Sequence, residues 1–107
     1  EDAAQAVGVN WRGKHCGTWG DVGCFSFFAD KTITTGEGGF VTTNNEEVYN
    51  KLLFLRNQGR KFRGSFVHPH IGYNFRITDV QAAIYHKRPT SLSAIRGSFF
   101  PPKTLKY

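Results

Sequence analysis

The chain has 107 residues, of which 39% are hydrophobic and 15% aromatic. This composition suffices for the core of one small domain and excludes an intrinsically disordered chain. No apolar run approaches the length of a membrane span and no signal-peptide pattern opens the sequence, which indicates a protein of the reducing cytoplasm. The sequence contains no methionine and opens within a motif at Glu1, so we expect an internal fragment of a longer chain.

The first twenty residues predict little regular structure. Asp2 on its own has the character of a surface carboxylate at a loop or a helix start. Residues 8–20 are punctuated by glycine and partly basic, which predicts a loop with a pair of short strands. The sequence indicates no particular partner for Trp11 and Trp19, which we expect to serve in packing or to lie at the surface.

An apolar and aromatic run over residues 24–28 predicts a buried strand. Because side chains alternate along a strand, Ser26 is expected to face away from the phenylalanines on either side of it. Cys24 lies within the run and is expected to be a small core residue. Its spacing from Cys16 fits neither a zinc site nor a redox pair.

Lys31 lies between this strand and a turn that has three glycines among residues 34–39. A lysine in such a place can have its ammonium partly desolvated, which favours the neutral amine that forms Schiff bases. The more frequent alternative is a solvated surface charge. The glycines match neither a phosphate-binding P-loop nor a dinucleotide-binding fingerprint. The residue pattern alone leaves both interpretations of Lys31 open.

Residues 38–43 predict a further strand, and the segment after it predicts an amphipathic helix with a structural role. Asn44 can cap this helix, with Glu47 at the third helical position as in a capping box. Gly59 is expected to end the helix. The apolar residues that recur at helical spacing are Val48, Leu52 and Leu55.

The segment after this helix, residues 60–69, is basic and irregular and predicts a loop. His68 and His70 flank a proline, but the neighbourhood offers no third ligand, so we expect no metal site. Asn74 by itself is typical of a turn.

A second capping box, formed by Thr78 and Gln81, predicts a helix that begins at Asp79. After Asp79 the chain has five basic residues and no acidic one, within a formal net charge of +6. Such a tail can bind phosphate-rich partners, although a soluble and mobile tail is the commoner case. Aromatic residues are sparse there and no RNA-binding signature occurs, so we do not expect a nucleic acid partner.

Several motifs occur in a fixed order along the chain. They are EDAAQA at 1–6, GDVGCFSF at 20–27, Lys31 with TTGEGG at 34–39, LRNQG at 55–59 and GYNFRITDVQAA at 72–83. Together they resemble the sugar-nucleotide aminotransferases of the DegT/StrS type. Those enzymes use pyridoxal 5'-phosphate (PLP) and have the aspartate-aminotransferase-like fold.

The resemblance covers about residues 1–84 and implies an α/β fold. The chain would be a partial piece of the large PLP-binding domain of a fold type I aminotransferase, which has a mixed, mostly parallel sheet with flanking helices. Residues 85–107 depart from the family, because Pro89 would stop the long apolar helix that continues there in the family. We predict that this divergent basic tail is not family sequence.

The resemblance also implies roles for five side chains. Lys31 corresponds to the catalytic lysine that forms a Schiff base with PLP and moves the proton of the reaction. Asp2 corresponds to the aspartate that pairs with the pyridine nitrogen, and Gln5 to the glutamine that helps to hold the cofactor from the same side. Ser26 corresponds to a phosphate ligand. Asn74 corresponds to the asparagine that reaches the phosphate of the neighbouring subunit's PLP.

The implied reaction transfers an amino group from an amino acid, usually glutamate in this family, to the keto group of a nucleotide-linked deoxysugar. The motifs indicate neither the sugar nor the ring carbon. The family's upstream phosphate loop, its aromatic residue that stacks on PLP and its C-terminal domain lie outside the matching segments. We therefore expect a segment of a larger, homodimeric enzyme that is inactive by itself. The alternative is a catalytically inactive remnant or a small basic binding module.

Overall fold

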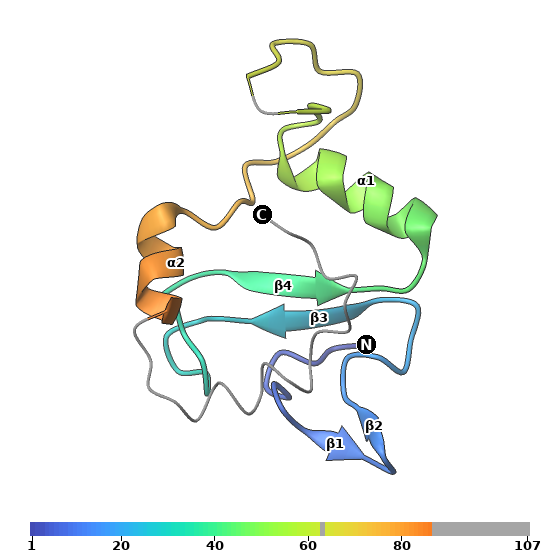
Figure 1. Cartoon of the computed structure of the whole chain (residues 1–107), viewed down its shortest axis with the longest axis vertical. Helices are drawn as coiled ribbons and strands as arrows, with labels where there is room; N and C mark the ends of the chain where they lie inside the picture. Colours follow the sequence, from blue (N-terminus) through green and yellow to red (C-terminus); the bar gives the residue numbers. More distant parts are fainter. Residues whose placement is uncertain (63, 87–107) are drawn as a thin grey trace.

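The computed structural model describes residues 1–62 and 64–86. Residues 87–107, with Pro89 and the basic tail, lie outside the described part. Figure 1 shows two small antiparallel strand pairs and two helices. In chain order the elements are β1 (Asn10–Trp11), β2 (Lys14–His15), β3 (Gly23–Ser26), β4 (Gly39–Thr42), α1 (Glu46–Arg56) and α2 (Asp79–His86). Within the described ranges, no helix has the length and apolar character needed to cross a membrane.

The core is built on the pair of β3 and β4. Phe25 and Phe40 face each other in the register of the two strands, and their rings stack with centroids 4.3 Å apart. The ring of Phe27 lies 5.4 Å from that of Phe40, within the range at which aromatic rings attract each other. The buried hydrophobic residues of the described part are Ala3, Phe25, Phe27 and Ile33.

The alternation predicted for β3 is confirmed, since Phe25 and Phe27 are buried and Ser26 is half-buried. The prediction that Cys24 is a core residue is wrong, because Cys24 is exposed and unpaired with Cys16. The period of two along the strand gives the reason. Once the two phenylalanines face the core, Cys24 must lie on the opposite face.

The strand pair predicted within residues 8–20 is present as the hairpin of β1 and β2. Its two tryptophans contact each other, with the rings of Trp11 and Trp19 5.2 Å apart between centroids. Two cations cover these rings, since Arg12 lies 4.3 Å from the Trp11 centroid and Lys14 lies 4.8 Å from the Trp19 centroid. The hairpin therefore has its own small cation–π cluster.

α1 begins one residue later than predicted, because Asn45 and not Asn44 caps it. The side chain of Asn45 accepts from the N–H groups of Glu47 (2.9 Å) and Val48 (3.1 Å). These donors are the second and third helical residues, which an N-cap must reach. The sequence offers two adjacent asparagines, and only this geometry selects between them.

The C-terminus of α1 is closed by Gly59, although the last helical residue is Arg56. Gly59 has a φ of +72° and its N–H donates to the carbonyl of Phe54 (2.8 Å). The helix does not continue to Gly59 because Gln58 has a left-handed backbone with a φ of +60°. The carbonyl of Leu55, left without a helical partner, accepts from the N–H of Tyr73 (2.6 Å). A later segment of the chain therefore pairs with the end of α1.

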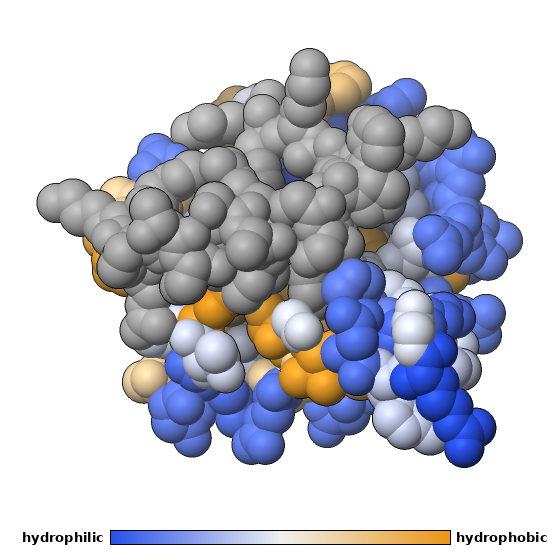
Figure 2. All heavy atoms as spheres, turned by 60° about the horizontal axis from the view of Figure 1, so that its bottom comes forward, coloured by the Kyte–Doolittle hydropathy of each residue, from blue (hydrophilic) through white to orange (hydrophobic). Residues whose placement is uncertain are grey.

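The histidines of the loop after α1 also contact the end of this helix. His68 Nδ1 lies 2.7 Å from the carbonyl of Gln58, and the ring of His70 meets that of Phe54 edge-on at 4.6 Å. α2 begins at Asp79 as predicted. Figure 2 shows, on the face that it brings forward, hydrophobic side chains gathered in a patch beside hydrophilic ones.

Two glycines with similar backbones differ in their surroundings. Gly17 has a φ of +85°, and a Cβ there would collide with the ring of Phe25. Gly13 has a φ of +76°, but a Cβ there would meet no described atom within 4 Å. A comparison of substitutions at the two positions therefore distinguishes the effect of backbone strain from the effect of packing.

We expect Gly17→Ala to destabilise the fold more than Gly13→Ala. The left-handed conformation costs an alanine about 1–2 kcal/mol at either position, and a methyl group forced against Phe25 adds about 1–3 kcal/mol. Urea unfolding followed by circular dichroism measures both losses of unfolding free energy. Equal losses in the two variants would show that residue 17 does not approach the core as described.

Glu1 fastens the loop before β3 to the start of the chain. Its Oε1 accepts from the N–H of Gly17 (2.7 Å) and its Oε2 from the N–H of Trp19 (3.0 Å). These two hydrogen bonds, that of Gly17 foremost, lower the pKa of the Glu1 carboxyl. The next residue, Asp2, forms a parallel bridge with Cys24. Glu1 therefore helps to hold Asp2 against β3.

We expect Glu1→Gln to destabilise the chain at neutral pH and to cost progressively less in acid. Because the pKa is lower in the folded state, the carboxylate stabilises the fold above its usual pKa of 4.5. That contribution disappears as the pH falls through the folded-state pKa. Urea unfolding over a pH series measures it, with Glu46→Gln on α1 as the control. A difference that stays constant over the series would contradict the role of the charge.

Candidate functional site

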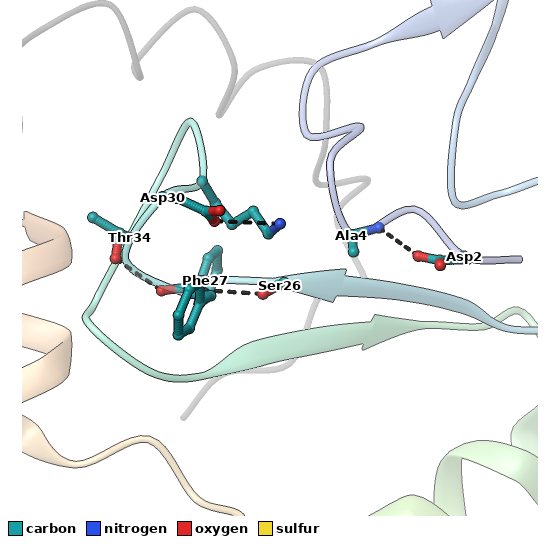
Figure 3. A network of polar contacts seen from close by, with 8 residues as sticks. Asp2, Ala4, Ser26, Phe27, Asp30 and Thr34 are labelled. Atoms are coloured by element: carbon teal, nitrogen blue, oxygen red, sulfur yellow. Dashed lines mark hydrogen bonds and ion pairs between the residues drawn. The ribbon is translucent and has the colours of Figure 1, made fainter.

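Three of the five predicted site residues lie on or next to β3. Ser26 is the last residue of β3, Lys31 lies in the loop that follows, and Asp2 bridges to Cys24 of the same strand. Figure 3 shows Asp2 with Ala4 on the segment beside β3, and Ser26 and Asp30 at the strand end and in the loop beyond it. An amine, a hydroxyl and a carboxylate are thus positioned around one strand.

The side chain of Lys31 is largely covered, and its amine has a carboxylate beside it. The backbone N–H of Lys31 donates to the carbonyl of Phe28 (3.0 Å), which makes a tight turn directly after the strand. Its Nζ lies 3.3 Å from Oδ1 of Asp30, and the Lys31 side chain is 18% exposed against 68% for Asp30. An ion pair with so exposed a partner stabilises little. The covering of the lysine stem therefore fixes the amine more than the ion pair does.

Two threonines close the loop that contains Lys31. Thr34 Oγ1 donates to the carbonyl of Phe27 (2.9 Å) and accepts from the N–H of Gly36 (2.9 Å). The N–H of Thr35 also donates to the Phe27 carbonyl (3.1 Å), while the N–H of Phe27 donates to the carbonyl of Gly38 (2.8 Å). The backbone of Phe27 thus holds residues 34–38, where the loop ends, through hydrogen bonds. The sequence motifs gave these threonines no individual role. The tendency of threonine hydroxyls to bond nearby backbone groups could have indicated it.

Ser26 and Asp2 each use one oxygen within the chain and keep another group available. Ser26 Oγ accepts from the N–H of Phe28 (3.1 Å), and no described residue accepts the hydroxyl proton. Oδ1 of Asp2 accepts from the N–H of Ala4 (3.1 Å), which orients the carboxylate. Among the described residues, its Oδ2 has no hydrogen-bond partner. Ser26 can therefore donate a hydrogen bond to an anion, and Asp2 can accept one from a cationic N–H group.

Gln5 and Asn74 stand apart from this group. No hydrogen bond or ion pair of the described part links either side chain to Lys31, Ser26 or Asp2, and both residues are exposed. The backbone of Asn74 forms a bridge with Asn57, and Figure 1 shows that segment passing the end of α1. In residues 1–62 and 64–86, no group of three histidine, cysteine or acidic residues is placed to hold a metal ion.

The sequence matches a family model described as the DegT/DnrJ/EryC1/StrS aminotransferase family over residues 1–96. The match runs past residue 84, where the motifs end, and the nature of residues 85–107 stays a prediction. GDP-perosamine synthase from Escherichia coli is 49% identical over 84 residues, which are 78% of this chain and 23% of that protein. The enzyme of the same name from Caulobacter vibrioides is 50% identical over the same shares.

A solved aminotransferase of Helicobacter pylori, involved in the biosynthesis of pseudoaminic acid, superposes with a TM-score of 0.73. It is 33% identical, and the match covers 90% of this chain and 26% of that one. The chain thus spans about a quarter of these proteins. The predicted fold class is confirmed, although parallel pairing is limited in the described part to single bridges such as that of Asp2. The chain belongs to the DegT/DnrJ/EryC1/StrS aminotransferase family.

Proposed function

We propose that this chain is the cofactor-attachment segment of a PLP-dependent sugar aminotransferase. The observation that carries the proposal is the largely covered side chain of Lys31, which lies in the loop after the strand that bears Ser26 and is bridged to Asp2. The named relatives support a nucleotide-linked keto-deoxysugar as the amino acceptor. An amino acid, with glutamate as the first candidate, is the donor.

The three groups fit PLP by their chemistry. The cofactor has an aldehyde, a pyridine nitrogen and a phosphate. The site offers a primary amine at Lys31, a carboxylate oxygen at Asp2 and a hydroxyl proton at Ser26. When bound, PLP supplies an electron sink for negative charge that develops on the substrate carbon.

Under this proposal each side chain has one task. Lys31 Nζ would hold the cofactor covalently and, once released, would act as the general base that takes the proton from the substrate carbon and delivers it to the former aldehyde carbon of the cofactor. Asp2 keeps the pyridine nitrogen protonated, and Gln5 supports the cofactor from the same side. Ser26 donates its hydroxyl proton to the phosphate. Asn74 serves the phosphate site of the partner subunit in a homodimer.

We further propose that the segment acts in the cytoplasm within a larger assembly and does not turn over by itself. The exposed hydrophobic residues of the segment before α2 support this proposal. Phe66 is 90% exposed, Ile71 84% and Phe75 73%. Soluble monomers rarely leave so much apolar surface uncovered, so we expect other protein to cover these side chains.

Attachment of PLP to Lys31 can be tested directly. The purified chain is incubated with PLP and reduced with borohydride, and the pyridoxyl-lysine is located by peptide mass mapping. We expect the label on Lys31 well above that on the exposed Lys51 and Lys61. Lys31→Ala should remove the preferred label, whereas the control Lys61→Ala should leave it in place. Even labelling of all lysines that Lys31→Ala does not change would contradict the proposal.

The phosphate role of Ser26 can be tested by comparing PLP with pyridoxal, which lacks the phosphate. We expect Ser26→Ala to lower the labelling of Lys31 by PLP about tenfold, because a hydrogen bond to a charged group contributes about 1.5 kcal/mol or more. Labelling by pyridoxal should stay at the wild-type level. This second probe is the control for the lost acceptor of the Phe28 N–H. A similar loss with both aldehydes would show that the substitution disturbs the loop and not a phosphate contact.

A further inference from the structure

One side chain fastens α2 to the glycine turn behind Lys31. Gln81 Nε2 donates to the backbone carbonyl of Glu37 (2.8 Å), across 44 positions of the sequence. The same carbonyl accepts from Thr35 Oγ1 (2.7 Å), and Thr35 is only 4% exposed. Two side chains from distant parts of the chain therefore meet at one backbone oxygen.

The other end of the Gln81 amide is fixed by the capping box of α2. Gln81 Oε1 accepts from the backbone N–H of Thr78 (2.8 Å) and from its Oγ1 (2.9 Å). A backbone N–H can only donate, so the atom that faces it must be the amide oxygen. The amide nitrogen must then face the Glu37 carbonyl. This orientation satisfies both ends, and a flipped amide would lose both.

The Glu37 carbonyl lies in the turn that closes the Lys31 loop. The neighbouring Gly38 carbonyl accepts from the N–H of Phe27, and the N–H of Thr35 donates back to the Phe27 carbonyl. α2 also contacts Phe27, since the rings of Tyr85 and Phe27 lie 5.8 Å apart between centroids. The helix therefore contacts the base of the loop at two places, and the contact of Gln81 is a directional hydrogen bond.

We propose that Gln81 is a positioning residue for Lys31. Its amide N–H fixes the Glu37 carbonyl, the turn holds the backbone of Phe27, and Phe27 leads into the loop that presents the amine. The inference deepens the proposed function and rests on it for the task of Lys31. The hydrogen bond itself can be tested without any cofactor.

Two variants separate the ends of the Gln81 side chain. Gln81→Glu keeps an acceptor for Thr78, because glutamate and glutamine both serve in capping boxes, but it turns an oxygen instead of an N–H toward the Glu37 carbonyl. Thr78→Val is the matched control. It removes the hydroxyl from the capping box and leaves the contact between Gln81 and Glu37 in place.

Hydrogen exchange of the full chain, followed by mass spectrometry, measures how well the backbone amides of this turn are protected. We expect peptides that contain the amides of Phe27 and Thr35 to exchange about fivefold faster in Gln81→Glu, which corresponds to about 1 kcal/mol for one hydrogen bond. In Thr78→Val these peptides should exchange at the wild-type rate. Wild-type exchange in Gln81→Glu would overturn the inference.

Labelling by PLP and borohydride then tests the consequence for the amine. We expect the ratio of label on Lys31 to label on Lys61 to fall about fivefold in Gln81→Glu and to stay unchanged in Thr78→Val. Faster exchange with an unchanged ratio would overturn the positioning role while the proposed function stands. A wild-type chain without preferred label on Lys31 would overturn the proposed function and, with it, the positioning role.

Discussion

The packing of Phe25 and Phe27 against Phe40 is the contact on which the rest of this structure depends. Only four hydrophobic residues of the described part are buried, so these rings form most of the core. Phe25 lies on β3 and Phe27 directly after it, and the same strand holds Asp2 by a bridge and leads into the loop of Lys31. A loss of this packing would release Asp2, Ser26 and Lys31 at once.

The same packing decides which way the site faces. Side chains alternate along β3 and at the residue that follows it, so burial of Phe25 and Phe27 directs Ser26 to the opposite face. A register shifted by one residue would bury Ser26 and expose both rings, at a large cost in apolar burial. The orientation of the hydroxyl is therefore secured by hydrophobic burial on the other side of the strand and needs no polar contact of its own.

Local patterns in the sequence predicted much of the fold and part of the candidate site. The alternation at Ser26 and the capping box of Thr78 and Gln81 depend on neighbours within a few residues, and both are present. The ordered motifs also predicted the family and the fold class. The prediction for Cys24 was wrong because it rested on the apolar character of the run, whereas the alternation used for Ser26 places Cys24, two residues earlier, on the same exposed face.

The remaining differences come from contacts between distant segments. The cap at Asn45 is one residue from the predicted one, and the Leu55 carbonyl near the end of α1 pairs with Tyr73, which no pattern within the helix reveals. The contact from Gln81 to the Glu37 carbonyl is of the same kind. The capping box was visible in the sequence, but the use of the spare amide N–H becomes apparent only when α2 lies beside the turn.

The exposure of Asp30 has a consequence for how easily the Lys31 amine can leave its ion pair. Asp30 is 68% exposed, so water solvates its carboxylate whether or not a cation lies beside it. When the amine leaves the ion pair, no buried charge is left without a partner, and the desolvation cost that follows from breaking a buried pair does not arise. The loop can therefore keep one shape whether or not the amine lies beside Asp30.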